Sequence, residues 1–222
     1  MNLIIEESVT NAAPDLQVIM IESDVTNQPT TPELKEELES LAIKIAGEYA
    51  LPDINKRPGI AATRAVYKAL GKEPNRYRPS CEAMCRRLVK GMGLYYINNL
   101  VDLINVLSIA SGYSIGGFDL DKVTGDTLSL GVGKEGEPFE GIGRGELNIH
   151  SLPLYRDSTG GIGTPTSDNE RTKLGPDTTR LLMCINIYGE EMSPDDTVNL
   201  ATDLLLRHAS ARNIKVTFHR AK

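Results

Sequence analysis

Residues 78–122, RPSCEAMCRRLVKGMGLYYINNLVDLINVLSIASGYSIGGFDLDK, decide the fold, because their signals predict a helix, a turn, a second helix and a strand. Pro79 and Ser80 suit a helix start, since proline fits the first helical position and a hydroxyl can accept from a free backbone N–H. Gly91 can end that helix in the left-handed conformation. Asn99 is predicted to cap the second helix, whose long apolar stripe indicates that it is mostly buried.

Asn105 is an amide in the interior of the second predicted helix. A buried amide without a hydrogen-bond partner costs about 1–3 kcal/mol. We therefore expect Asn105 to be buried with polar partners. We also expect its helix to form one wall of a cavity, together with the glycine pair that precedes Phe118.

Outside this stretch, predicted strands and helices alternate. Apolar or alternating runs predict strands at residues 16–22, 127–132, 152–155, 181–188 and 214–218. Capping residues and helical periodicity predict helices at residues 32–47, 60–70 and 194–209. This order predicts an α+β fold with mixed and antiparallel sheet layers packed with helices. We expect residues 1–76 to form an N-terminal strand and helices packed on a core of residues 77–222, which ends in a strand, a helix and a strand.

Composition limits the class of protein. At 222 residues and 40% hydrophobic content, the chain can bury one sizeable core. It has no apolar run of roughly 20 residues, the length that spans a bilayer, and no signal-peptide pattern at its start. We therefore expect a cytoplasmic protein without a membrane partner. The three cysteines and three histidines lack ligand spacing, so we expect no disulfide framework, no metal and no cofactor.

Charge is unevenly distributed along the chain. The net charge is −6, but residues 56–90 contain ten basic and two acidic side chains. Such a basic segment on an acidic protein is typical of a phosphate-binding face, since lysine and arginine displace counterions from a polyanion. The alternative is that these side chains are only the solvated faces of two helices. The predicted RNA-binding residues are Arg64, Lys68, Lys72, Arg76, Arg78, Arg86, Arg87 and Lys90.

Common catalytic signatures are missing from the sequence. It has no GxSxG or HExxH motif, and its histidines stand alone, so we expect neither a catalytic triad nor a zinc hydrolase. The glycines in residues 160–163 are not followed by GK[ST], which argues against a phosphate-binding loop. The polar segment 156–173 is long for a loop within a compact domain, and such loops are functional or disordered.

Several motifs resemble the B3/B4 tRNA-editing domain of the phenylalanyl-tRNA synthetase beta subunit. They are INNLVDLIN, GGFDLDK, TGDTLSL, KEGEPFEGIG and DTTRLLM, and the resemblance covers residues 77–188, about half the chain. The preceding KALGKEPNRYRPSCEAMCRRLVKGMGL is similar to free-standing relatives of that domain. The resemblance implies a B3/B4-like fold in a solo domain, with tRNA or aminoacyl-tRNA as its partner.

The resemblance also implies the site residues. It points to Asn105, Asp168 and Arg171 as catalytic polar groups, and to a substrate pocket formed by Asp119, Gly116, Gly117, Gly161 and Thr172. Local alternatives are a turn and cap role for Asp119 and a surface ion pair for Arg171. The family's HAFDLD motif has a histidine where this chain has Gly116, and Cys184 stands in the place of a family glutamate. Since those side chains supply hydrogen bonds, their loss is expected to relax or retarget discrimination between amino acids.

Three functions remain open on the sequence. The first is a deacylase that hydrolyses mischarged aminoacyl-tRNA in trans, using a pocket that fixes a water beside an already activated ester. The second is a non-catalytic RNA-binding module, and the third is an amino-acid-binding protein with a degenerate pocket. Nothing in the sequence resembles an ATP-binding aminoacylation core, so amino-acid ligation is not expected.

Overall fold

Two four-stranded sheets form the centre of the computed structural model, which describes residues 1–221. Sheet I has the order β10-β2-β9-β3 with antiparallel neighbours, formed by β2 (Gln17–Asp24), β3 (Ile115–Asp119), β9 (Arg180–Ile187) and β10 (Arg212–Arg220). Sheet II has the order β1-β4-β7-β8, formed by β1 (Asn2–Ile5), β4 (Thr127–Val132), β7 (Pro153–Arg156) and β8 (Gly161–Gly163). Only the pairing of β1 with β4 is parallel in sheet II. Strands β5 (Glu140–Gly141) and β6 (Gly145–Glu146) form a separate hairpin.

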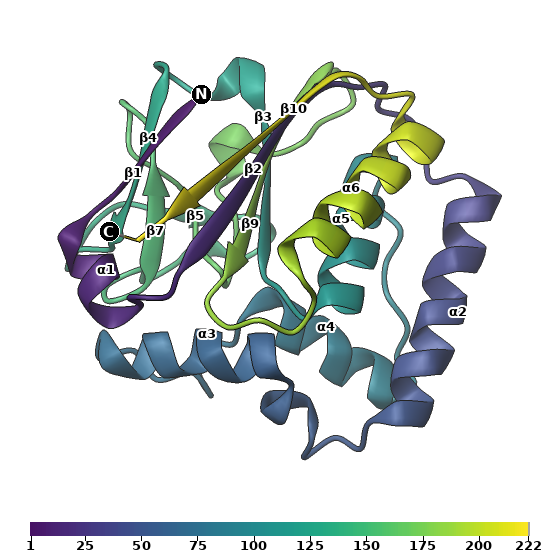
Figure 1. Cartoon of the computed structure of the whole chain (residues 1–222), viewed down its shortest axis with the longest axis horizontal. Helices are drawn as coiled ribbons and strands as arrows, with labels where there is room; N and C mark the ends of the chain where they lie inside the picture. The colour runs from purple at the N-terminus through teal and green to yellow at the C-terminus, as the bar shows by residue number, and fades with distance from the viewer. Residues whose placement is uncertain (222) are drawn as a thin grey trace.

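Within residues 1–221, six α-helices surround these sheets. They are α1 (Glu7–Ala12), α2 (Pro32–Glu48), α3 (Pro58–Ala69), α4 (Ser80–Val89), α5 (Asn99–Ser111) and α6 (Pro194–Ala209). Short 3-10 helices occupy Ile54–Lys56, Leu120–Lys122 and Glu170–Thr172. Helices α5 and α6 lie on one side of sheet I, and sheet II lies on the other side (Figure 1). The predicted α+β fold of mixed and antiparallel sheets packed with helices is therefore confirmed.

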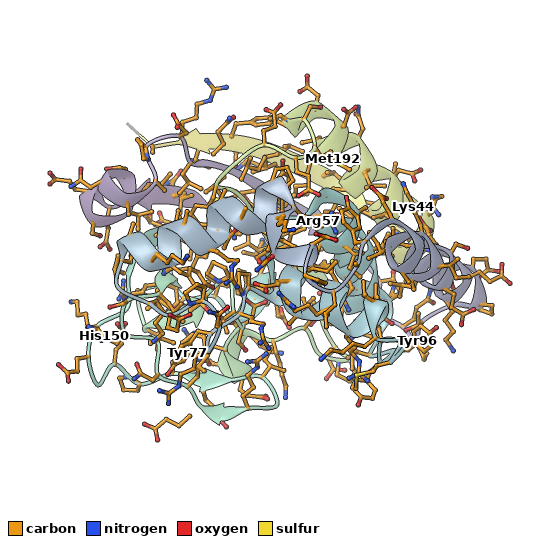
Figure 2. All side chains as sticks on the ribbon, turned by 90° about the horizontal axis from the view of Figure 1, so that it is seen from below. Lys44, Arg57, Tyr77, Tyr96, His150 and Met192 are labelled. Carbon is orange, nitrogen blue, oxygen red and sulfur yellow. The ribbon has the colours of Figure 1, made fainter. Side chains whose placement is uncertain are left out.

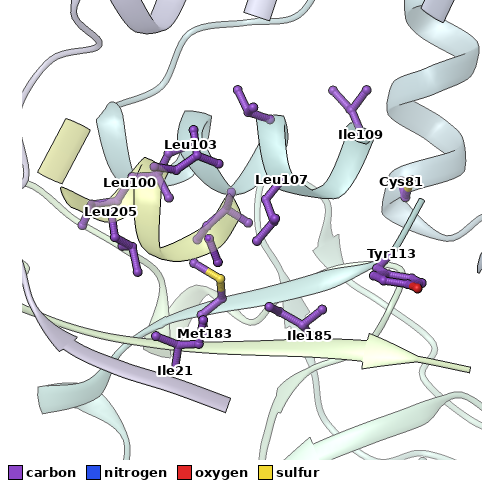
Figure 3. Packing of buried hydrophobic residues seen from close by; sticks show 14 of the residues in the cluster. Ile21, Cys81, Leu100, Leu103, Leu107, Ile109, Tyr113, Met183, Ile185 and Leu205 are labelled. Carbon is purple, nitrogen blue, oxygen red and sulfur yellow. The ribbon is translucent and has the colours of Figure 1, made fainter. Parts of the chain in front are cut away.

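Sheet I is buried on both faces. Ile19 and Ile21 of β2 belong to the cluster formed with α5 and α6, whereas Val18 and Met20 belong to the cluster shared with sheet II. This division follows from the strand geometry, in which successive side chains project to opposite faces. Figure 3 shows the first cluster, in which sheet residues such as Met183 and Ile185 lie near the helix residues Leu100, Leu103, Leu107 and Leu205.

The N-terminal part of the chain contributes strands to both sheets. Strand β2 is an interior strand of sheet I, paired on one side with β9 and on the other with β10. Strand β1 is the edge strand of sheet II. Residues 1–76, predicted as an addition packed on the core, thus form part of both sheets. Strand β2 also supplies side chains to both large hydrophobic clusters. A division of the chain at residue 76 stays a prediction.

The start of α5 differs from the prediction. Asn98, not Asn99, caps the helix by accepting a hydrogen bond from the backbone N–H three residues on. Asn99 is fully buried. Its Nδ2 donates to the carbonyl oxygens of Thr26 at 2.8 Å and His208 at 2.7 Å, and its Oδ1 accepts from the Gln28 N–H at 2.9 Å. Asn99 therefore ties α5 to the segment after β2 and to the end of α6.

The described residues 1–221 contain neither a membrane-spanning helix nor a cluster of metal-binding side chains. None of their helices combines the length and apolar character needed to cross a membrane. They also contain no group of three or more His, Cys, Asp or Glu side chains that could hold a metal ion. Cys81, Cys85 and Cys184 are free thiols and are buried.

We predict that Asn99→Ala destabilises the protein by at least about 2 kcal/mol, because it leaves two buried carbonyl groups and one N–H without their partner. Urea denaturation measures the loss. Asn105→Ala on the same helix is the matched control, since no residue in 1–221 hydrogen-bonds to the Asn105 side chain. We expect that control to stay within about 1 kcal/mol of wild type. Equal losses in the two variants would contradict the bridging role of Asn99.

Candidate functional site

The edges of sheets I and II meet at Asp168. Strand β3 is the last strand of sheet I and β8 is the last strand of sheet II. The Gly117 N–H of β3 donates to Asp168 Oδ2 at 3.0 Å, and Asp168 forms a β-bridge with Gly163 of β8. The Asp168 carbonyl also accepts from the N–H of Ile142 in the β5–β6 hairpin at 3.0 Å. One residue thus joins both sheet edges and the hairpin.

A cavity of about 520 Å³ opens beside this junction. It lies between α4, α5, the free edge of β3 and the β5–β6 hairpin. Its apolar lining consists of Met84, Ile97, Val101, Ile104, Ile115, Ile142 and Leu174. Its polar lining consists of Ser80, Asn105, Ser108, Arg144, Thr164, Thr166, Ser167, Asp168 and Lys173. Although the polar residues are more numerous, most of the surface that faces the cavity is apolar. An apolar surface with converging polar groups is typical of a small-molecule site.

Two glycines leave room for the Asp168 carboxylate. A Cβ atom at Gly163 would lie 2.7 Å from Asp168 Oδ1, and one at Gly116 would lie 3.5 Å from it. Either Cβ atom would also lie 2.6 Å from the ring of Phe118. Burial in this surrounding raises the pKa of Asp168 to about 7, although the hydrogen bond from the Gly117 N–H opposes the shift. A carboxyl group with this pKa can accept or donate a proton near neutral pH.

Asn105 lines the same cavity. The prediction that it is buried with polar partners is wrong, because the residue is half-buried and its side chain has no hydrogen-bond partner within residues 1–221. Its amide is therefore available to a ligand. Of the predicted cavity walls, the helix and Gly117 line the cavity, whereas Gly116 does not.

Other predicted pocket residues lie away from the cavity lining. Asp119 accepts from the Asp121 N–H and from Thr178 Oγ1, which is the cap role given above as its alternative. Gly161 packs against Phe139 and Leu154. Thr172 is fully buried, and its hydroxyl has no partner among residues 1–221. Gly116 faces Phe118 and Asp168 on the opposite side of β3 from Gly117.

Arg171 is not brought into the cavity. Its guanidinium makes two hydrogen bonds to the Asp157 carboxylate, at 2.8 and 2.9 Å, and a longer one to the Lys122 carbonyl. Burial opposes ionisation of Asp157, but the bonds from Arg171 and from three backbone N–H groups hold its pKa below the ordinary value. The bidentate pair connects the end of β7 to the segment before β9, so Arg171 has a structural contact here in place of the predicted catalytic one.

Gly116 and Cys184, the two departures from the family motif, are direct neighbours across β3 and β9. Cys184 is fully buried in the cluster between the sheets, and burial raises the pKa of its thiol far above the ordinary value. It therefore stays a neutral thiol. The polar group beside this pair of positions is the Asp168 carboxylate, which arrives from a different segment of the chain.

Three of the predicted RNA-binding residues are used inside the protein. The fully buried Glu82 carboxylate forms ion pairs with Arg64 at 2.8 Å and Arg86 at 2.7 Å. Lys72 is buried and donates to the carbonyls of Asn148 at 2.8 Å and His150 at 2.6 Å. Removing one partner of a buried charge pair is strongly destabilising, so these cations are needed for folding and are not free for a ligand.

The remaining predicted cations are accessible. Lys68, Arg76, Arg78 and Lys90 are exposed. Arg78, Arg87 and Lys90, with the partly buried Arg86, line a hollow of about 320 Å³ that also includes Met92; we call it the basic hollow. Helix α4 separates this hollow from the cavity, with Ala83 on the hollow side and Met84 on the cavity side.

Several cavity residues could not be recognised from the sequence. Ser80 and Ser108 gave no signal because both fit ordinary helix positions. Arg144 and Ile142 lie at the tip of the β5–β6 hairpin, which the sequence showed only as a glycine-rich region. The length of segment 156–173 did indicate a functional loop, and this segment supplies β8 and Asp168.

The sequence profile of the B3/4 domain matches residues 62–212, which is more than half of the chain. The chain therefore belongs to the B3/4 domain family. No curated protein sequence matches the chain. Among solved structures, it is similar to an N-terminal fragment of the phenylalanyl-tRNA synthetase beta subunit from Pyrococcus horikoshii, with 13% identity and a TM-score of 0.45. That alignment covers 97% of this chain and 50% of the fragment, so the chain spans half the length of its structural neighbour.

We predict that the stability of the protein depends on pH through Asp168. The folded protein keeps the Asp168 proton up to about pH 7, whereas an ordinary aspartate has a pKa of 3.8. Rising pH through this window therefore lowers the wild-type free energy of unfolding, while Asp168→Asn, which retains an acceptor for the Gly117 N–H, lacks this loss. Urea midpoints from pH 4 to pH 8 should show wild type declining relative to the variant, with Asp177→Asn running parallel to wild type. A gap between wild type and Asp168→Asn that stays constant over this pH range would contradict the burial argument.

Proposed function

We propose that this chain binds tRNA and hydrolyses the ester of wrongly attached amino acids in trans. The observation that carries the proposal is the cavity. Asp168 and Asn105 line it together with apolar side chains, and accessible cations lie on the other side of α4. Membership of the B3/4 domain family supports a tRNA-related role. We expect the protein to act in the cytoplasm, as part of translation.

The ester needs a nucleophile, a proton acceptor and a partner for the carbonyl oxygen. Asp168 can take a proton from a water as the water oxygen attacks the ester carbon, because its pKa of about 7 leaves a large carboxylate fraction at neutral pH. The Asn105 amide can donate to the carbonyl oxygen as negative charge develops on it. The carbon–oxygen bond to the ribose then breaks, Asp168 returns the proton to the ribose oxygen, and the free amino acid leaves.

The cavity lining indicates the accepted side chain. Met84, Ile104 and Leu174 offer apolar contact, and a cavity of about 520 Å³ holds a large aliphatic or aromatic side chain. Gly116 and Cys184, the two departures from the family motif, do not line the cavity. We therefore propose recognition by apolar contact and size, which discriminates less sharply than a set of buried hydrogen bonds.

A second candidate function rests on the charges around the cavity. Asp168 could pair with an ammonium group, and Arg144 and Lys173 could pair with a carboxylate, which together fit a free amino acid. Thermal shift with amino acids separates the two functions, because a ligand stabilises the protein increasingly as its concentration exceeds the dissociation constant. Stabilisation by free amino acids without any deacylation would favour the second function.

We predict that Asp168→Asn lowers the deacylation rate by roughly 100- to 10,000-fold, because it removes the proton acceptor. Asn105→Ala is predicted to lower it by roughly 100- to 1,000-fold through loss of the carbonyl partner. Release of labelled amino acid from a panel of mischarged tRNAs measures both effects. Asp177→Asn and Asn199→Ala are matched controls on exposed positions and should retain the wild-type rate. No release above the spontaneous rate from any member of the panel would refute hydrolysis, and persistent tRNA binding would then leave the non-catalytic RNA-binding function.

We predict that reversing two cations near the basic hollow weakens tRNA binding. The double variant Arg78→Glu with Lys90→Glu should reduce affinity and flatten its salt dependence, because each lost phosphate contact removes about one unit from the salt slope. Mobility shifts at several salt concentrations measure this. The control Arg212→Glu with Arg220→Glu changes net charge equally on exposed positions of β10. If both double variants weaken binding equally, the effect is one of net charge and the proposed face is wrong.

A further inference from the structure

The segment between α4 and α5, residues 91–97, carries an unusual amount of exposed apolar surface. Nine large hydrophobic side chains are exposed within residues 1–221, and four of them fall in this segment. These are Met92 at 56%, Tyr95 at 72%, Tyr96 at 41% and Ile97 at 62%. Apolar surface concentrated in this way marks an interaction site more often than single exposed side chains do.

Contacts on both sides hold the segment in place. Gly91 and Gly93 have φ values of +69° and +62°, which let the chain turn sharply after α4. The Tyr96 hydroxyl donates to Glu39 of α2 at 2.9 Å, and Lys35 of α2 lies 5.2 Å from the centre of the Tyr96 ring. Figure 2 shows Tyr96 at the periphery of the molecule beside α2. Tyr96 thus anchors the segment to α2, whereas its neighbour Tyr95 is exposed to solvent.

Tyr95 is backed by a cation. The Arg87 guanidinium carbon lies 4.5 Å from the centre of the Tyr95 ring. Arg87 is fixed in turn by donating to the backbone carbonyls of Gly93 at 2.6 Å and Met92 at 3.4 Å. The Tyr95 ring therefore has the Arg87 guanidinium close to it, and most of the Tyr95 side chain is exposed to solvent.

The segment touches both candidate binding places. Met92 lines the basic hollow, together with Arg78, Arg87 and Lys90. Ile97 lines the cavity that contains Asp168 and Asn105. Tyr95 lies between these two residues in the chain, and its ring contacts Arg87, which lines the basic hollow.

We propose that Tyr95 is a stacking platform for a base of single-stranded RNA, with the adjoining phosphate held in the basic hollow. This inference rests on the proposed function, because it supplies the place where the unpaired end of a tRNA would lie before it enters the cavity. Aromatic rings next to cations are how proteins bind single strands without reading their sequence. Charge favours RNA over a protein partner here, since the basic hollow beside Tyr95 is lined by three arginines and a lysine and by no acidic side chain.

The test uses the full chain, with a short fluorescently labelled single-stranded RNA and a blunt RNA duplex as probes. Tyr95→Ala should weaken single-strand binding by about five- to one-hundred-fold, the effect of one lost base stack. Tyr95→Phe should keep the wild-type affinity, because it keeps the ring. Phe218→Ala removes an exposed aromatic from β10 and is the matched control, expected to bind like wild type. Duplex binding should be unchanged in all three variants.

The outcomes separate this inference from the proposed deacylase function. Wild-type affinity in Tyr95→Ala, or no single-strand binding by wild type, would overturn the platform even if deacylation is observed. Self-association of wild type that Tyr95→Ala abolishes, without any RNA binding, would overturn it in favour of a protein contact. Loss of single-strand affinity in Tyr95→Ala would support the platform even if no mischarged tRNA is hydrolysed.

Discussion

The contact of Asp168 with the free edge of β3 is the constraint on which the site depends. An edge strand presents unpaired backbone groups, and the Asp168 carboxylate satisfies the Gly117 N–H. Its own backbone joins β8 and the β5–β6 hairpin to the same point. The two sheets consequently cannot separate at this edge without losing bonds to one residue, and the cavity lies beside that closed junction.

The junction also sets the chemistry of the cavity. Glycines at 116 and 163 are required because a larger residue would collide with Phe118 or with the carboxylate itself. The resulting enclosure raises the pKa of Asp168 into the neutral range. The same packing therefore stabilises the protonated carboxyl, costs stability when it ionises, and prepares a group that can exchange a proton at neutral pH.

The basic segment illustrates how burial divides charges by role. Glu82 lies in the first turn of α4, is fully buried, and forms ion pairs with Arg64 and Arg86. The Lys72 ammonium group donates hydrogen bonds to two backbone carbonyls. What remains for a polyanion is a smaller group of exposed cations and the basic hollow. A count of charges along the sequence could not make this distinction, because it depends on which side chains face the buried Glu82 carboxylate.

The sequence by itself determined the helices and strands of the central stretch, the α+β class and the family, since caps, apolar periodicity and the INNLVDLIN and GGFDLDK motifs are local features. It also identified Asn105, Asp168 and Gly117, which share the cavity. It could not show that Asn99 rather than Asn98 bridges three segments, or that Arg171 pairs with Asp157. Those roles were decided by the tertiary structure, because a polar side chain bonds to whatever group the fold brings within about 3 Å, and such neighbours come from distant parts of the chain.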